Sequence, residues 1–108
     1  MTGSPLYRIV AFVKPFRLDA VIESLKGLDV SDIEIAEVRG YGRQKGHLEL
    51  YSGTEYTITF LPKIRLEMLC APGSLDRACE AVRQAAWTGR IGDGKILVLE
   101  GEAAEMST

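Results

Sequence analysis

The apolar positions of this chain switch between a two-residue period and a helical period, and the switches mark the elements of a small mixed fold. Residues 7–13 have apolar side chains at every second position and predict a strand that is buried on most of its surface. Pro15 interrupts this strand. A helix is predicted next, because the following apolar residues have helical spacing: Leu18, Val21, Ile22, Leu25 and Leu28. Residues 33–38 alternate again and predict a second strand.

The second half of the chain repeats this order. Residues 56–70 predict a long strand, within which Pro62 indicates a bulge or an edge position without a partner. Ser74 is a suitable N-cap for a second helix. The inward positions of that helix share small or aliphatic side chains: Leu75, Ala78, Cys79, Val82, Ala85 and Ala86. Residues 96–99 predict a last strand, and the small, acidic residues 100–108 predict a frayed tail.

Two β-α-β halves in one chain of 108 residues predict a single α+β domain with the ferredoxin-like plan. In that plan the element order is βαββαβ, the four strands form one antiparallel sheet, and both helices cover the same face. The opposite face of the sheet would be exposed in a monomer. Because the strands are rich in apolar residues, we expect a homo-oligomer to cover that face.

Charge and composition narrow the choice of partners and compartment. The chain has 13 basic and 15 acidic residues, a net charge of −2, which argues against a nucleic-acid partner. No apolar run approaches the roughly 20 residues of a membrane span, and the first ten residues lack the features of a secretion signal. We therefore expect a cytoplasmic protein without membrane insertion. Cys70 and Cys79 are expected to be buried, reduced thiols.

The connection between the second and third predicted strands, about residues 42–56, is long for a segment without secondary structure of its own. It combines tyrosines, leucines and charges, so it is neither low in complexity nor purely polar. Two interpretations follow. The segment is either a binding surface or an extended hairpin whose tip packs on itself.

Residues 88–95 form a second unusual segment, with three glycines and the cations Arg90 and Lys95. Backbone N–H groups in such a loop can approach an anion, because no Cβ stands in the way. The spacing from Gly89 to Lys95 matches a Walker loop, but Ile96 replaces the Mg²⁺-binding Ser or Thr and a strand follows in place of a helix. The segment predicts either a phosphate cradle or a tight turn, and the two cations favour the cradle.

Residues suited to catalysis are scarce in this sequence. His47 is the single histidine, and it has no Cys or His partner at metal-ligand spacing. Binding without turnover is therefore favoured. The alternatives are a small phosphate-handling enzyme on the same fold and a purely structural oligomer. An enzyme of the acylphosphatase type would need an Arg–Asn pair, and the sequence contains no asparagine.

Three groups of residues together resemble the PII signal-transduction proteins: Lys14-Pro15-Phe16, residues 40–47 and residues 88–95. The resemblance extends from about Tyr7 to Leu99. It implies a non-enzymatic homotrimer of ferredoxin-like subunits that binds ATP or ADP in the clefts between neighbours, together with a small metabolite. It also implies that the long loop regulates an enzyme or a membrane transporter in nitrogen or carbon metabolism.

The resemblance also implies roles for individual residues. Phosphates would be held by the glycine-rich segment, consisting of Gly92, Asp93, Gly94 and Lys95, with Arg90 adding charge. Gly42 and Arg43 would meet the phosphates from the other side of the cleft. Glu67 and Leu69 would line the adenine pocket.

Three further residues match the metabolite and modification positions of the family. Gln44 would help to complete a Mg²⁺–ATP–2-oxoglutarate site, because its neutral oxygen suits a hard cation. Lys63 would pair with the carboxylate of the metabolite. Tyr56 matches the tyrosine that some members carry nucleotidylated.

The sequence departs from the family pattern at four positions. Two arginines that clamp the nucleotide phosphates fall on Met106 and Thr108, which predicts weaker nucleotide binding. The arginine that plugs ammonium channels falls on Ser52, and Glu34 stands where a threonine usually meets the adenine amino group. A carboxylate at position 34 could accept a hydrogen bond from that group. These departures suggest a divergent member, and a carbon-linked sensor of adenine nucleotide plus bicarbonate is the alternative to a 2-oxoglutarate sensor.

Overall fold

The computed structural model describes residues 4–43, 58–90 and 92–103, which form one α+β unit. The strands are β1 (Ser4–Val13), β2 (Val30–Arg43), β3 (Ile58–Cys70) and β4 (Gly94–Ala103). The helices are α1 (Leu18–Ser24) and α3 (Leu75–Ala86), and each follows a 3₁₀ turn, η1 (Pro15–Arg17) or η2 (Pro72–Ser74). Neither of these two helices has the length and apolar character needed to cross a bilayer.

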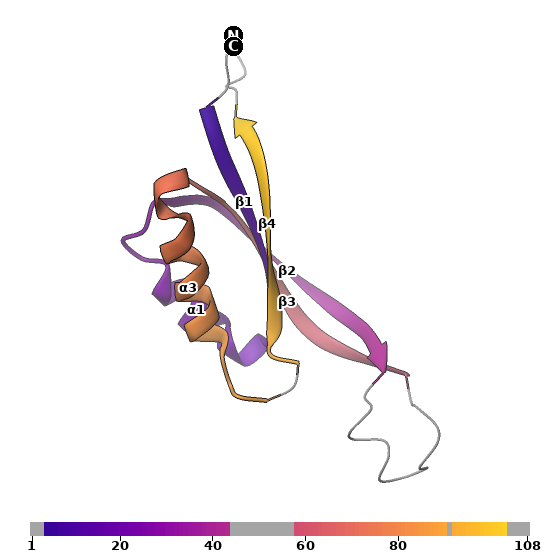
Figure 1. The fold of residues 1–108 in the computed structure, drawn as a ribbon. Helices are drawn as coiled ribbons and strands as arrows, with labels where there is room; N and C mark the ends of the chain where they lie inside the picture. The colour runs from indigo at the N-terminus through magenta and orange to yellow at the C-terminus, as the bar shows by residue number, and fades with distance from the viewer. Residues whose placement is uncertain (1–3, 44–57, 91, 104–108) are drawn as a thin grey trace.

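The four strands form one sheet in the order β2-β3-β1-β4, and every neighbouring pair is antiparallel. Both helices lie on the same face of this sheet (Figure 1). The element order and the strand order confirm the predicted ferredoxin-like βαββαβ plan. The central strands, β1 and β3, have partners on both sides, and the core forms between these two strands and the helices.

The core lies between the helices and one face of the sheet. Ile9, Ala11 and Val13 point toward the helices from β1, and the strand register places them opposite Met68, Leu66 and Ile64 of β3. The helices contribute buried residues at helical spacing: Val21, Ala78, Val82 and Ala86. The two apolar periods of the sequence therefore meet in one layer, as the pattern predicts.

The first helix is shorter than its apolar pattern. α1 ends at Ser24, whereas the predicted stripe continues to Leu28. Gly27 adopts a left-handed φ of 82°, which reverses the chain at little steric cost for a residue without Cβ. Leu25 is nonetheless buried, and Leu28 still packs against the core.

The hairpin of β2 and β3 is longer than the sequence pattern indicates. β2 begins at Val30 and continues to Arg43, so residues 39–43 pair with β3 although no regular period marks them. The register irregularity lies between Ser31 and Glu34 and not at Pro62. Pro62 pairs with Arg39, but β1 ends opposite Ile64, so β3 has a neighbour on one side only at the proline. An edge position tolerates the missing N–H, as predicted.

Residues 100–103, predicted to belong to a frayed tail, instead extend β4. The ladder with β1 continues from Tyr7 opposite Glu100 to Ser4 opposite Ala103. Because β1 begins three residues earlier than Tyr7, these acidic residues find backbone partners that their composition does not reveal. Residues 104–108 lie outside the described part of the chain.

The N-cap of α3 and the two cysteines were also predicted from the sequence. Ser74 occupies the N-cap position of α3, but its hydroxyl makes no capping hydrogen bond, because a 3₁₀ turn leads into the helix. Cys70 is buried, as expected, whereas Cys79 is only half-buried, and both thiols are free. Burial raises the pKa of each thiol and so disfavours its reactive thiolate.

The second face of the sheet carries no helix. Val10 and Phe12 of β1 point to this open face, between Leu97 and Lys95 of β4 on one side and Glu67 and Arg65 of β3 on the other. Leu97 and Leu99 are 47% and 44% exposed there. The open face therefore combines apolar surface with a row of charges.

Gly94 is predicted to be indispensable for stability. A Cβ at this position would overlap the carbonyl oxygen of Phe12 and lie 2.9 Å from its carbonyl carbon, and the φ of 135° is strained for any other residue. Gly94→Ala should therefore lower the free energy of unfolding by about 2–4 kcal/mol. Urea unfolding at one fixed protein concentration measures this loss. Gly73→Ala, where a Cβ has open space, should change stability by no more than about 0.5 kcal/mol, and equal effects would contradict the prediction.

Candidate functional site

The turn between α3 and β4 lies at the end of the sheet where β1 leaves it at Val13 (Figure 1). Gly89, Gly92 and Gly94 all have positive φ, at 79°, 83° and 135°. These conformations let the chain turn sharply twice within a few residues. Gly94 also packs directly against the backbone of Phe12, which anchors the second half of the turn to β1.

Asp93 organises the first half of this turn. One carboxylate oxygen, Oδ2, accepts hydrogen bonds from the backbone N–H of Thr88 at 2.7 Å and of Gly89 at 3.0 Å. The other, Oδ1, accepts from the Thr88 hydroxyl and pairs with Lys14 Nζ at 3.0 Å. Lys14 also donates to Thr88 Oγ1 at 3.3 Å. The hydrogen bonds from Thr88, together with those from Lys14 and Gly89, hold the pKa of Asp93 well below its usual range.

Lys63 connects the turn to the long strand β3. Its Nζ donates a hydrogen bond to the carbonyl oxygen of Gly92. Burial lowers the pKa of this amine, the positive charge of Lys14 lowers it further, and Asp93 opposes the shift. The residue predicted to meet a metabolite carboxylate therefore touches the segment predicted to hold phosphates, although 29 residues separate Lys63 from Gly92.

A hollow of about 460 Å³ opens beside this contact on the open face of the sheet. Its lining includes the following residues: Phe12, Gly40, Lys63, Gly92, Gly94 and Lys95. The Nζ of Lys95 lies 5.4 Å from the centroid of the Phe12 ring, a cation–π distance. Two lysines and three glycines thus surround a space that a small anion could enter.

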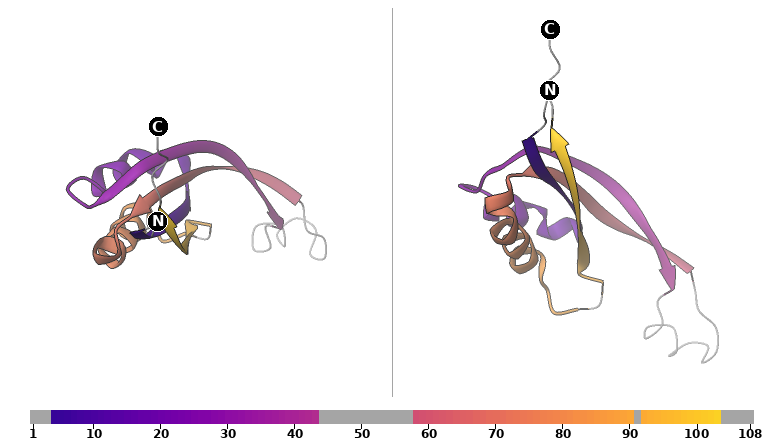
Figure 2. Two further views of the ribbon diagram at one scale, coloured as in Figure 1. Left: turned by 90° about the horizontal axis from the view of Figure 1, so that it is seen from above. Right: turned by 45° about the horizontal axis from the view of Figure 1, so that its top comes forward.

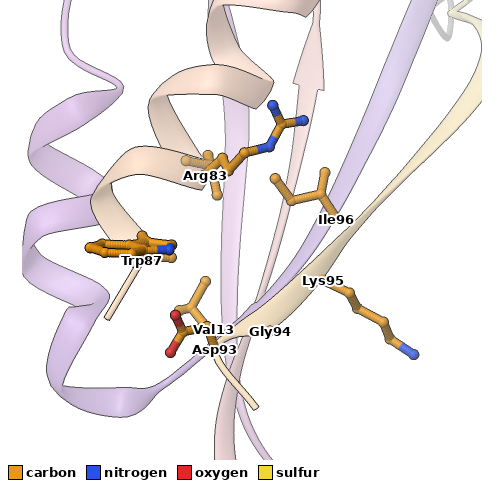
Figure 3. Close-up of a pocket in the computed structure, with 9 residues that line it drawn as sticks. Val13, Arg83, Trp87, Asp93, Gly94, Lys95 and Ile96 are labelled. Atoms are coloured by element: carbon orange, nitrogen blue, oxygen red, sulfur yellow. The ribbon is translucent and has the colours of Figure 1, made fainter. Parts of the chain in front are cut away.

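A second pocket, of about 250 Å³, lies on the other side of β4, beneath the end of α3 (Figure 3). Its walls include Val82, Trp87 and Ile96, and the amine of Lys95 points away from it. Arg83 at its rim pairs with Glu80 at 2.7 Å. This pocket is mainly apolar; Asp93, Gly94 and Lys95 also line it, but Lys63 and Gly92 do not. The sequence pattern does not predict this pocket, because Trp87 carries no periodic signal.

The predicted adenine residues form a separate cluster further along the open face. Glu34 lies directly opposite Glu67 in the β2–β3 register, and both line a hollow of about 480 Å³ with Leu69 and Arg8. Glu67 also pairs with Arg65 at 3.3 Å. Four residues of extended strand separate Lys63 from Glu67, about 13 Å. One chain therefore presents the predicted site residues as two groups.

The remaining predicted residues lie at the ends of the described segments or outside them. Gly42 and Arg43 end β2, where their backbones pair with Thr59 and Ile58. Arg90 is exposed in the glycine-rich turn. Gln44 and Tyr56 lie outside the described residues, as do most of the long loop and His47. The hairpin that carries this loop projects well beyond the helices (Figure 2). Within residues 4–43, 58–90 and 92–103, no three His, Cys, Asp or Glu side chains gather as a metal site would require.

The described residues thus combine a ferredoxin-like sheet, a glycine-rich turn beside two lysines and a projecting hairpin. The sequence model of nitrogen regulatory protein P-II matches residues 6–107, and the chain belongs to this family. Members of the family are signalling proteins and not enzymes. The family resemblance seen in the sequence is thereby confirmed, and the phosphate-handling enzyme is set aside.

Individual relatives agree with this assignment. The chain is 50% identical to nitrogen regulatory protein P-II of Rhodospirillum rubrum over 97 residues, which cover 90% of this chain and 87% of the relative. It is 52% identical to that of Haemophilus influenzae, again over 90% and 87%. Among solved structures, Bacillus subtilis GlnK matches with a TM-score of 0.72 and 27% identity, covering 90% of this chain and 85% of GlnK. The B. subtilis GlnK–ATP complex has the same fold, with a TM-score of 0.72 and 20% identity over 93% and 84%.

The acid sensitivity of this protein should depend on Asp93. Because hydrogen bonds lower its pKa in the folded protein, its stabilising contribution is complete above about pH 5 and is lost progressively as the pH falls below that value. The stability difference between the wild type and Asp93→Asn should therefore shrink between about pH 6 and about pH 3. Urea unfolding across this range measures it. Asp76→Asn, on the exposed side of α3, is the matched control, and a pH-independent difference for Asp93→Asn would refute the assignment.

Proposed function

We propose that this PII family protein binds the phosphates of an adenine nucleotide, ATP or ADP, at the glycine-rich turn. In this proposal, nucleotide binding sets the conformation of the long loop, about residues 42–56, which then regulates an enzyme or a membrane transporter. The observation that supports it most is the meeting of Lys63, Gly92 and Lys95 around one hollow. The B. subtilis GlnK–ATP complex, which has the same fold, supports ATP as the ligand.

Electrostatics favour a phosphate at this position. Lys63 and Lys95 supply positive charge, and exposed Arg90 adds to it from the turn. Burial disfavours the charged form of Lys63. An incoming anion would therefore stabilise this charge more strongly than the carbonyl oxygen of Gly92, which accepts its hydrogen bond now. Gly92 lets the ligand approach the backbone closely. We further propose that Arg43 contributes a cation from the base of the long loop.

The two clusters of predicted residues favour a site shared between subunits. The turn of one subunit would bind the phosphates, while Glu34, Glu67 and Leu69 of a neighbour would meet the adenine. A carboxylate at either glutamate can accept a hydrogen bond from the adenine amino group. A homotrimer would also cover Leu97 and Leu99, which are exposed on the open face of a single chain. In this proposal, the same packing of subunits on the open face forms the trimer and completes the nucleotide site.

Co-ligands and modification complete the proposal. Gln44 would help to hold Mg²⁺ with ATP and 2-oxoglutarate, and Lys63 would exchange its contact with Gly92 for the carboxylate of the metabolite. Bicarbonate is the second candidate for this position, since it presents the same charged oxygens. Tyr56 is proposed as the modified tyrosine. A ligand can switch the loop only through different affinities for its two conformations.

Removing the amine of Lys95 should weaken nucleotide binding. If Lys95 makes a charged hydrogen bond to phosphate, Lys95→Ala should lower the affinity for ATP about 10- to 100-fold, and Lys95→Arg should recover part of the loss. Isothermal titration calorimetry with ATP and with ADP measures the affinity. Lys26→Ala is the matched control, because this lysine is 71% exposed and pairs with nearby Glu23 on α1.

The same titration separates the co-ligands. ATP is titrated with and without Mg²⁺, and each series is repeated with 2-oxoglutarate and with bicarbonate. The true co-ligand should raise the apparent ATP affinity, and ATP should raise its affinity by the same factor. Absence of heat from ATP and ADP in every series would remove the sensor function.

The open face should be the subunit contact. The native mass in light scattering should be three times the 11.9 kDa of one chain. Leu99→Glu should shift this mass toward that of a monomer, because it places a charge in the covered apolar surface. Phe16→Glu makes the same change on η1, next to the helices, at a side chain 72% exposed, and should leave the mass unchanged. A monomeric wild type would contradict the shared site.

A further inference from the structure

We infer that Asp93 and Lys14 are positioning residues, an ion pair that holds the turn in the shape that presents Gly92–Lys95 to a phosphate without itself contacting the ligand. This inference rests on the proposed function, since it concerns the same turn. It differs from the family resemblance, which placed Asp93 among the groups that hold the phosphates and gave Lys14 no role in the site.

The hydrogen bonds of the turn show which backbone groups remain for a ligand. Three consecutive amides, those of Thr88, Gly89 and Arg90, donate to oxygens of the turn's own side chains, at 2.7, 3.0 and 3.3 Å. The acceptors are Asp93 Oδ2 for the first two and Thr88 Oγ1 for the third. These three amides are therefore occupied, and the backbone groups of the described residues that remain for an anion lie in the second half of the turn, from Gly92 onward.

The contacts of Asp93 also exclude it as a phosphate ligand. Both carboxylate oxygens already accept from the turn or from Lys14, and a carboxylate repels a phosphate. Its effect on the site is indirect. By tying residues 88 and 89 to position 93, it closes the first half of the turn, so that Gly92 reaches the amine of Lys63.

Lys14 makes this arrangement compatible with an anionic ligand. Its Nζ lies 3.0 Å from Asp93 Oδ1, and the two side chains are only 20% and 22% exposed, so water screens the pair weakly. Lys14 follows the last residue of the central strand β1, which places its backbone at the end of the sheet. It therefore both fixes the carboxylate to the sheet and cancels a negative charge that would otherwise face the phosphate.

A charge-removal cycle tests the ion pair in the full-length protein. Lys14→Met leaves the Asp93 carboxylate uncompensated beside the phosphate site and should lower the affinity for ATP about tenfold. Lys14→Met combined with Asp93→Asn removes both charges, while the asparagine keeps an oxygen for the Thr88 and Gly89 amides. The double variant should recover most of the ATP affinity. Lys26→Met is the matched control for loss of a lysine.

The double variant distinguishes positioning from a general structural role. If its loss of ATP affinity equals or exceeds the product of the two single losses, the charge compensation is refuted. Calorimetry with ATP is the measurement. Circular dichroism and urea unfolding of the same samples identify any variant that fails to fold.

A ligand-free measurement tests the positioning independently of nucleotide binding. Asp93→Ala removes the acceptor of two amides, so hydrogen exchange at Thr88 and Gly89 should accelerate at least about tenfold, whereas the core amide of Leu66 should be unaffected. Unchanged exchange at Thr88 and Gly89 would overturn the inference. A wild type that binds no ATP but shows this acceleration would refute the proposed function and leave the structural role of Asp93 confirmed.

Discussion

Burial of a single sheet face under two short helices is the constraint on which the other features depend. The helices cover Ile9, Ala11 and Val13 of β1 together with their neighbours on β3. The alternation of a strand then forces the residues between them, such as Val10 and Phe12, onto the opposite face. That face consequently carries both the apolar surface available to another subunit and the charges of the candidate ligand site. In the proposed function, oligomer contact and ligand binding thus share one surface.

In the glycine-rich turn, the carboxylate of Asp93 would support the proposed anion site without repelling the anion. Asp93 is placed where a ligand carrying negative charge is proposed to bind, yet its oxygens face the turn and Lys14. The hydrogen bonds that shape the turn also keep the carboxylate ionised, and the lysine balances its charge. Two further cations, Lys63 and Lys95, lie on the side of the open sheet face. In this proposal, Asp93 and Lys14 determine the shape of the turn, and Lys63 and Lys95 supply the positive charge.

Several features were predictable because local physics decides them. The apolar periods located the core residues of β1 and α3, and the three glycines near Lys95 marked the turn as unusual. Other features depended on distant partners. Residues 39–43 and 100–103 have no strand pattern, yet each becomes a strand because a neighbouring strand is long enough to offer backbone hydrogen bonds. The short α1 depends on the left-handed turn at Gly27.

By itself, the sequence determined the fold class, the layer that forms the core and the family, because period, composition and motifs are properties of consecutive residues. Only the tertiary structure decided that Lys63 touches Gly92, that Lys14 neutralises Asp93, and that Glu34 lies opposite Glu67. These pairs are brought together by strand register and by the end of β1, which no short window of sequence contains. The motifs predicted which residues belong to the candidate site, and the packing of the strands determined which of them lie together.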